Sequence, residues 1–196
     1  APSKNYGQVA SIPAITYTGL LGNDATSFTT GLTVNTVAGM TAGTSVTDGV
    51  TLGAGTYNVS VVGQSNTNYV IASNPATGIL TVNKATITVA GISALEHAYS
   101  DAAISNASLT SATTVTGLVN NDTFASLSPT FSIKNGATTV TDGATLNAGT
   151  YSSNLTGITS NNYVLNSVNA SGVFTVTPKV LTVSSISNAG HTYGSS

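Results

Sequence analysis

The stretch "SVTDGVTLGAGTYNV" at residues 45–59 returns 94 residues later as "TVTDGATLNAGTYSS" at residues 139–153. Tyr57 and Tyr151 hold the same place in the two stretches, and so do the acidic residues of the two "TDG" triplets. Uncommon residues that keep the same spacing distinguish a true repeat from chance similarity between segments rich in Thr and Ser. A period of this length is too long for one coil of a solenoid, so it predicts two copies of a small domain.

Other tyrosines follow the same spacing. Tyr69 and Tyr163 lie 94 residues apart, each within an "NYV" motif. Tyr99 lies 94 residues before Tyr193 and 93 residues after Tyr6. Between the two "ND" pairs the offset widens to 98 residues, which predicts a loop of different length in the two copies. The repeat therefore extends over nearly the whole chain.

The composition limits the possible functions. Hydrophobic residues make up 40% of the 196 residues and charged residues 5%, with no Cys, a Lys and Arg total of 4 and a net charge of −2. A nucleic-acid-binding surface requires a stripe of basic residues, and a disulfide or a thiolate metal site requires Cys. Both are therefore excluded. No apolar run reaches the roughly 18 residues of a membrane-spanning helix, so we expect no direct membrane insertion.

The local pattern is that of strands. Val, Ile and Thr are frequent in short segments that turn signals separate, as in β-proteins. Asp48 and Asp142 each precede a Gly, and Asp-Gly pairs favour tight turns because Gly tolerates a positive φ. The sequence predicts an all-β chain of two tandem immunoglobulin-like β-sandwich repeats, with β-grasp-like or small barrel units as the alternative. An Ala-rich stretch at 94–109 is the one candidate helix, and we expect no helix shared by both copies.

The motifs "LGAGTY" and "LNAGTY" lead into strands through Gly55-Thr-Tyr57 and Gly149-Thr-Tyr151. This arrangement is similar to the tyrosine corner of immunoglobulin-like sandwiches, where a Tyr hydroxyl bonds to the backbone a few residues upstream. Stacking of these Tyr rings on sugars is the functional alternative. We favour the structural interpretation, because a Tyr that enters a strand on its apolar side usually packs and finds one hydrogen-bond partner.

The junction between the copies shows a change in strand parity. In "LTVNKATITV" the apolar residues are Leu80 and Val82, then Ile87 and Val89, so the inward positions change from even to odd numbers. A strand that reverses its buried face leaves one packed layer for another. We therefore predict a domain boundary near Lys84, with too short a linker for free movement.

The second copy shows the same change around Pro178 and Lys179. The predicted domains are then 1–84 as the first β-sandwich repeat, lacking its own first strand on this phasing, and 85–178 as the second. Residues 179–196 are either the first strand of a third repeat or the closing strand of the second.

Residues capable of chemistry are few. His97 and His191 hold the same repeat position, but acidic neighbours accompany His97 only, and a catalytic triad needs His, a nucleophile and a carboxylate together. The aspartates, Asp24 and Asp122 included, are best explained as turn residues. We predict no enzyme activity, no metal site and no cofactor. Tyr69 and Tyr163 begin strands and are expected to point inward, as structural residues.

Several short motifs recur in a fixed order. They are "NYG" at 5–7 and "HTYG" at 191–194, "TYTGLLGND" at 16–24 and "VTGLVNNDT" at 115–123, followed in each copy by "AGTY", "NYV" and a closing "TV". In this order the chain resembles the MBG and YDG-type repeats found in tandem in large bacterial surface proteins, including those of the filamentous-haemagglutinin class. The resemblance implies export to the cell surface and a role in adhesion or biofilm structure. It implies no catalytic residues.

The leading functional hypothesis is a structural stalk or spacer module of an extracellular bacterial adhesin, whose immediate partners are neighbouring repeats of the same chain. The alternative is a module that binds a glycan or a host surface protein through the Asn- and Ser-rich loops at 64–68 and 159–162. A first copy that lacks a strand also has an open sheet edge, which is a template for strand addition. This predicts head-to-tail strand exchange through residues 179–196.

Overall fold

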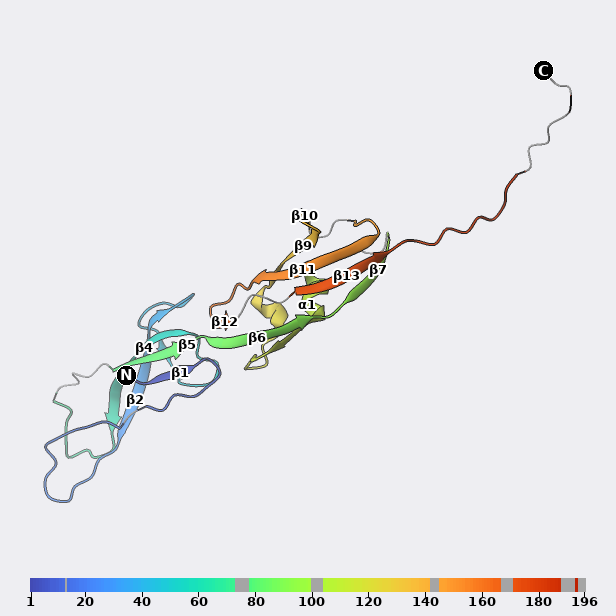
Figure 1. The fold of residues 1–196 in the computed structure, drawn as a ribbon. Helices are drawn as coiled ribbons and strands as arrows, with labels where there is room; N and C mark the ends of the chain where they lie inside the picture. Colours follow the sequence, from blue (N-terminus) through green and yellow to red (C-terminus); the bar gives the residue numbers. More distant parts are fainter. Residues whose placement is uncertain are drawn as a thin grey trace.

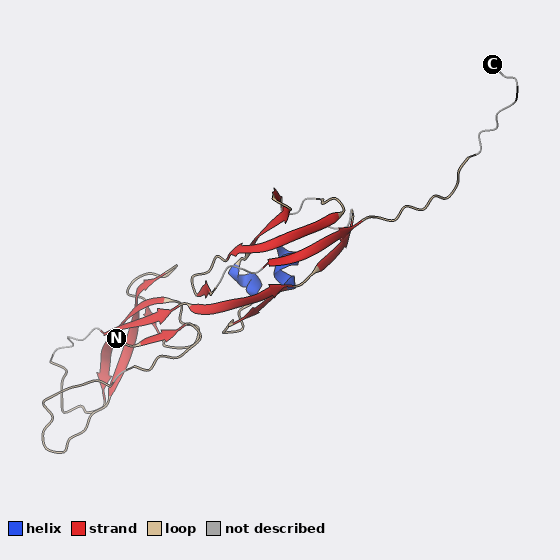
Figure 2. Cartoon of the chain, viewed as in Figure 1, coloured by secondary structure: helices blue, strands red, loops and turns tan. Residues whose placement is uncertain are grey.

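The computed structural model describes residues 1–12, 14–72, 78–99, 104–141, 145–166, 171–187 and 193. These residues form two bodies that lie end to end, with the C-terminal segment extending beyond the second (Figures 1 and 2). Strands dominate and helices are short, so the prediction of an all-β chain is confirmed. We call the residues up to 83 the first unit and residues 85–177 the second unit.

The first unit is built on one five-stranded sheet with the spatial order β1-β5-β4-β2-β3. Its strands are β1 (Ser3–Asn5), β2 (Phe28–Val37), β3 (Ser45–Val46), β4 (Gly55–Gln64) and β5 (Gly78–Asn83). The edge strand β1 is parallel to β5, and the other pairs are antiparallel.

The second unit repeats this sheet, with the spatial order β7-β13-β11-β9-β10. Its strands are β7 (Leu95–Ala98), β9 (Thr130–Asn135), β10 (Thr138–Val140), β11 (Gly149–Gly157) and β13 (Ser171–Thr177). The sequence repeat is reproduced in the strand register. Tyr57 pairs with Leu80 in the first sheet, and Tyr151 pairs with Phe174 at the equivalent place in the second.

The second unit also has a three-stranded sheet with the order β12-β6-β8. It consists of β6 (Ala85–Ile92), β8 (Thr113–Thr116) and β12 (Tyr163–Leu165). The central strand β6 buries Ala85, Ile87 and Ile92. Two short helices, α1 (Asn106–Ala112) and the 3-10 helix η1 (Phe124–Leu127), lie beside the sheets (Figure 2).

Helix α1 falls partly within the Ala-rich stretch. Ser105 caps its first turn by accepting a hydrogen bond from the Ser108 N–H at 3.3 Å, as N-cap residues do. Leu109 is buried on its inner side together with Phe124 and Leu127 of η1. The described residues of the first unit contain no helix, in line with the expectation that the copies share none.

The first unit has no counterpart of the three-stranded sheet in the described residues. The position equivalent to β6 would lie 94 residues before Ala85, ahead of the first residue of this sequence. Residues 15–18 and 69–71, which correspond to β8 and β12, form no strand. Both outer strands of the three-stranded sheet pair only with β6, so without a central strand neither has a partner.

The finer prediction of immunoglobulin-like sandwiches is not confirmed. Immunoglobulin sheets are antiparallel, whereas β1, β7 and β12 each pair with a parallel neighbour. The second unit does consist of two sheets in contact, but helices share its core.

The glycines before the two buried tyrosines differ in their surroundings. Gly55 has φ 153° and Gly149 has φ 157°, values that disfavour other residues. A Cβ at Gly55 would lie 2.3 Å from the carbonyl oxygen of Thr36, whereas at Gly149 the nearest atom, in the Tyr151 ring, would be 3.9 Å away. Close backbone packing therefore requires Gly only at the first of these positions.

The segment after β13 lies outside any strand as far as it is described, at 178–187. Its apolar side chains are exposed: Val180 by 88%, Leu181 by 90%, Val183 by 77% and Ile186 by 89%. Both predictions for 179–196, a closing strand or the start of a third repeat, stay predictions, because this segment pairs with no strand here.

Candidate functional site

Several polar contacts at the junction between the two units join residues that are far apart in the chain. Strand β5 ends at Asn83 and β6 begins at Ala85, so Lys84 alone links the two. The Ala85 N–H donates to the carbonyl of Asn162 at 2.8 Å, and the Lys84 ammonium donates to the carbonyl of Ser160 at 3.1 Å. Because β5 and β6 are each paired within a separate sheet, the one-residue linker between them leaves little freedom for the units to rotate.

Two tyrosines meet across the junction. Tyr6 of the first unit packs edge-on against Tyr163 of the second, with ring centroids 5.4 Å apart and ring planes at 83°. Their hydroxyls converge on Asp122 Oδ2, from Tyr6 at 3.1 Å and from Tyr163 at 2.9 Å. The Tyr163 oxygen also accepts the Val119 N–H at 3.0 Å. We call Tyr6, Val119, Asp122 and Tyr163 the joint cluster.

The environment of Tyr163 keeps its hydroxyl protonated. Burial raises its pKa, the hydrogen bond to Asp122 and the charge of that carboxylate raise it further, and the Val119 N–H lowers it, to a net value of about 12. The side chain is 3% exposed. The proton that Tyr163 shares with the carboxylate is therefore retained at all physiological pH values.

Tyr6 is followed by a glycine that the packing requires. Gly7 has φ 90°, and a Cβ there would lie 2.6 Å from a methyl carbon of Val119. Tyr6 thus supplies one ring of the joint cluster. Gly7, which has no side chain, lets Val119 of the second unit lie directly against the backbone of the first.

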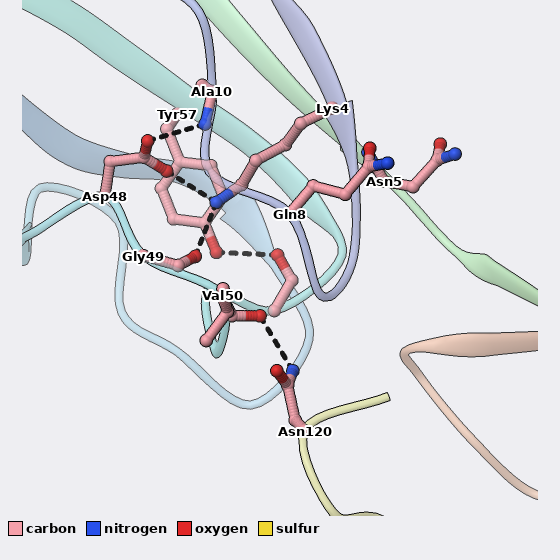
Figure 3. Close-up of polar contacts among 10 residues, drawn as sticks. Lys4, Asn5, Gln8, Ala10, Asp48, Gly49, Val50, Tyr57 and Asn120 are labelled. Carbon is pink, nitrogen blue, oxygen red and sulfur yellow. Dashed lines mark hydrogen bonds and ion pairs between the residues drawn. The ribbon is translucent and has the colours of Figure 1, made fainter. Parts of the chain in front are cut away.

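The loop 47–54 carries further bonds between the units. The Val50 carbonyl accepts the side-chain amide of Asn120 at 2.7 Å (Figure 3). The Ala54 N–H donates to Asn162 Oδ1 at 2.9 Å. Because Asn120 and Asn162 lie in separate loops of the second unit, loop 47–54 is held at two points.

Behind this loop lies a buried ion pair. The Lys4 ammonium, on β1, donates to Asp48 Oδ1 at 2.5 Å and to the Gly49 carbonyl at 2.6 Å (Figure 3). The Lys4 side chain is 2% exposed and that of Asp48 14%. Asp48 Oδ2 accepts the Ala10 N–H at 2.7 Å. The ion pair therefore fixes loop 47–54 to the edge strand whose end carries Tyr6.

The two predicted tyrosine corners have the following geometry. The Tyr57 hydroxyl donates to the Gly53 carbonyl at 2.8 Å, and the Tyr151 hydroxyl donates to the Asn147 carbonyl at 2.9 Å. Both rings are buried, and burial raises the pKa of Tyr57. Each bond spans four residues and ties the preceding loop to its strand.

The aspartates predicted as turn residues do more than shape turns. Asp48 precedes a turn in which the Leu52 N–H donates to the Gly49 carbonyl at 3.3 Å, but its carboxylate holds Lys4, a partner that the sequence analysis missed. The available signal was that Lys4 is one of very few cations and stands at the repeat position of His97. Asp142 lies outside the described residues.

Tyr69 and Tyr163 occupy equivalent places in different surroundings. Tyr163 begins β12 and is buried, as expected. Tyr69 lies in no strand and is half-buried, so the expectation that it begins a strand is wrong for this copy. Its hydroxyl nevertheless donates to Asp24 Oδ2 at 2.6 Å and accepts the Leu21 N–H at 3.1 Å, the same bonds that Tyr163 makes. We call Leu21, Asp24 and Tyr69 the N-terminal cluster.

The loops predicted for glycan binding direct polar groups to their own chain. In the loop 159–162, Asn162 and Ser160 bind across the junction as described above. In the loop 64–68, the Gln64 side-chain amide donates to the Tyr69 carbonyl, and Asn66 Nδ2 donates to the Ala25 carbonyl at 3.2 Å.

No group of three or more His, Asp or Glu side chains among the described residues is arranged to hold a metal ion. Likewise, none of the helices described is long and apolar enough to cross a membrane.

Comparison with known families gives one match. Residues 86–175 match the family model of the MBG domain (YGX type). The matched segment runs from β6 into β13 and so includes Asp122 and Tyr163 of the joint cluster. A search of curated proteins and a search of solved structures found no match. The match agrees with the resemblance to MBG-type repeats, and it covers residues 86–175 of the 196 in this chain.

Proposed function

We propose that this chain is a spacer module of a large bacterial cell-surface or secreted adhesin, in which stiffly joined repeats extend the protein away from its anchor. The single observation that carries the proposal is the junction, where one linking residue, Lys84, is accompanied by the joint cluster and by the bonds of loop 47–54. The MBG match supports a repeat module, and the resemblance to surface-protein repeats is the reason that we propose a place at the cell surface.

The proposed mechanism is mechanical. Both units have their long axis along the direction in which they are joined (Figures 1 and 2), so each added repeat lengthens the molecule. Bonds on several sides of Lys84 resist both bending and twisting, because rotation about the linker would separate Tyr6 from Asp122 and Val50 from Asn120 together. A spacer with such joints transmits force and position along its length.

The stiffness can be measured directly because the chain has no Cys. Two introduced cysteines, Asn35→Cys on β2 and Val173→Cys on β13, give one spin label on an exposed position of each unit. Pulsed electron spin resonance should show a narrow distribution of distances between the labels. Insertion of four Gly and Ser residues after Lys84 should broaden that distribution while both units stay folded.

A broad distribution in the uninserted protein would refute the spacer proposal. A glycan array probed with the same protein tests the alternative role. Specific, reproducible binding to one glycan class would replace the spacer role with a recognition role.

A further inference from the structure

The second unit takes up tension through two strands that are far apart in the sequence and touch in the fold. In a spacer under load, force enters this unit through β6, which follows Lys84, and leaves through β13, after which the chain continues. We propose that the parallel pair of β7 and β13 is a mechanical clamp, which makes the second unit resist unfolding when the chain is stretched. This inference rests on the proposed spacer role, because only a spacer that carries load needs such a clamp.

The two strands that receive the load are each flanked on both sides. Strand β6 lies between β12 and β8 in the three-stranded sheet, and β13 lies between β11 and β7 in the five-stranded sheet. Bonds at both ends of β12 also hold β6: the Ala85 N–H donates to the Asn162 carbonyl at 2.8 Å, and the Asn166 N–H donates to the Ile87 carbonyl at 2.9 Å. Neither loaded strand can leave its sheet without breaking the pairing on both of its sides.

Strand β7 connects the two ends of the load path directly. It follows β6 closely in the chain, and it pairs in parallel with β13 from Leu95 opposite Phe174 to Ala98 opposite Thr177. The Tyr99 N–H continues this pairing by donating to the Thr177 carbonyl at 2.8 Å. Residues that follow the point where force enters are thus bonded side by side to residues that precede the point where it leaves.

The direction of the load decides how these bonds break. Strands β6, β7 and β13 all run along the axis that joins the two units, away from the first unit (Figure 1). Tension pulls β6 and β7 toward the first unit and β13 away from it, so β13 is drawn lengthwise along β7. In a parallel pair the hydrogen bonds are evenly spaced along the strands. Sliding therefore strains all of them together, whereas peeling from one end would break them one at a time.

A glycine brings the two loaded strands into direct contact. Gly172 of β13 is buried, and a Cβ there would lie 2.7 Å from Ile92 Cβ and 3.0 Å from the Ile92 carbonyl oxygen, at the end of β6. Such a close approach to another backbone requires a residue without a side chain. The contact adds to the clamp, because β13 cannot slide along β7 without also moving across β6.

The backbone N–H groups of β7 do not all face β13. Strand β7 is the last in its sheet, and alternate residues of a strand bond to the same neighbour. The bond from the Tyr99 N–H to Thr177 sets the phase, so the His97 N–H also faces β13 and the Glu96 N–H faces away from it. Proline has no N–H and is tolerated where an edge strand faces solvent. Proline at 97 therefore removes a bond of the clamp, and proline at 96 removes none.

The first test changes the direction of the load and leaves the clamp intact. Because the full chain has no Cys, the DNA handles of an optical trap can be attached to two introduced cysteines. The pair Lys84→Cys/Pro178→Cys stretches the second unit along its length, so that β13 slides along β7. The pair Tyr99→Cys/Pro178→Cys pulls on one end of the same two strands, so that they peel apart. At one loading rate, the unfolding force should be several-fold larger for the first pair.

The second test removes one bond of the clamp. At a constant force applied through cysteines 84 and 178, His97→Pro should raise the unfolding rate about threefold to tenfold, the effect of losing one backbone hydrogen bond. The matched variant Glu96→Pro should unfold at the rate of its parent.

Equal unfolding forces for the two pairs of handles would overturn the proposal, and so would equal unfolding rates for the two proline variants. The comparison of handles needs neither proline variant, so it decides the question even if His97→Pro does not fold. None of these results depends on the distance distribution between the two units, which tests the spacer proposal separately.

Discussion

The ion pair between Lys4 and Asp48 provides the sharpest test of how the first unit is held together. In Asp48→Ala the Lys4 ammonium, whose side chain is 2% exposed, would keep only the Gly49 carbonyl as a partner. The Ala10 N–H would also lose its acceptor. Removing one partner of a buried ion pair costs about 3–5 kcal/mol. Asp48 is 14% exposed, so water reaches the space that its carboxylate leaves. We therefore expect Asp48→Ala to lower the free energy of unfolding by about 3 kcal/mol, the lower end of that range.

Substitution of the other partner of the ion pair should lower the free energy of unfolding by less. In Lys4→Met the carboxylate of Asp48 keeps the Ala10 N–H and its access to water, so we expect a loss of about 1–2 kcal/mol. In the double variant no buried charge remains without a partner. Its loss should therefore fall short of the sum of the two single losses by about 2 kcal/mol.

Urea denaturation followed by two-dimensional NMR measures this cycle unit by unit. The amide signals of Tyr57 and Leu80 report on the first unit, and those of Tyr151 and Phe174 report on the second. A loss below about 1 kcal/mol in Asp48→Ala, where unpaired buried charges cost several times that, would refute the reasoning. The reasoning would also be refuted if the loss of unfolding free energy in the double variant equalled the sum of the two single losses.

Three further predictions concern the repeat equivalents and the junction. Gly55→Ala should lower the melting temperature much more than Gly149→Ala, because both meet the same backbone strain but only the first clashes with backbone atoms; thermal unfolding by circular dichroism of the two variants checks this. Asp122→Ala should broaden the distance distribution between the units, whereas the matched variant Asp24→Ala should leave it narrow, since Asp24 lies away from the junction; equal broadening in both would contradict the role of the joint cluster. Finally, Tyr163 has a folded-state pKa of about 12 against about 10 when unfolded, so its stabilising effect is complete below pH 10 and is lost as the pH rises toward 12. The unfolding free energy of the wild type should therefore fall more steeply over that interval than that of Tyr163→Phe, and parallel pH profiles would count against it.

Much of the local structure followed from the sequence because its causes lie close together in the chain. The hydroxyl bonds of Tyr57 and Tyr151 reach only four residues back. The change of inward parity around Lys84 depends on two adjacent strands, and β5 and β6 do lie in different sheets. The repeat offset likewise fixed which residues of the two five-stranded sheets are equivalent, as the paired positions of Tyr57 and Tyr151 show.

The candidate site was much less accessible to sequence reasoning. Asp122 looked like a turn residue because its neighbours are Asn and Thr, and nothing near it indicated that Tyr6, 116 residues away, donates to it. Lys4 and Asp48 are 44 residues apart, and no spacing rule links an edge strand to a distant loop. Such partners are chosen by the folding of the whole unit.

The sequence by itself determined that the chain is a β-rich tandem repeat, because alternation along a strand and turn chemistry act over a few residues. Only the tertiary structure decided that Lys4 pairs with Asp48, a residue in a loop far along the chain. It also decided that the copies meet through two tyrosines on one carboxylate. Both outcomes depend on which strands lie side by side, and that is settled by burial and hydrogen bonding between residues far apart in the chain.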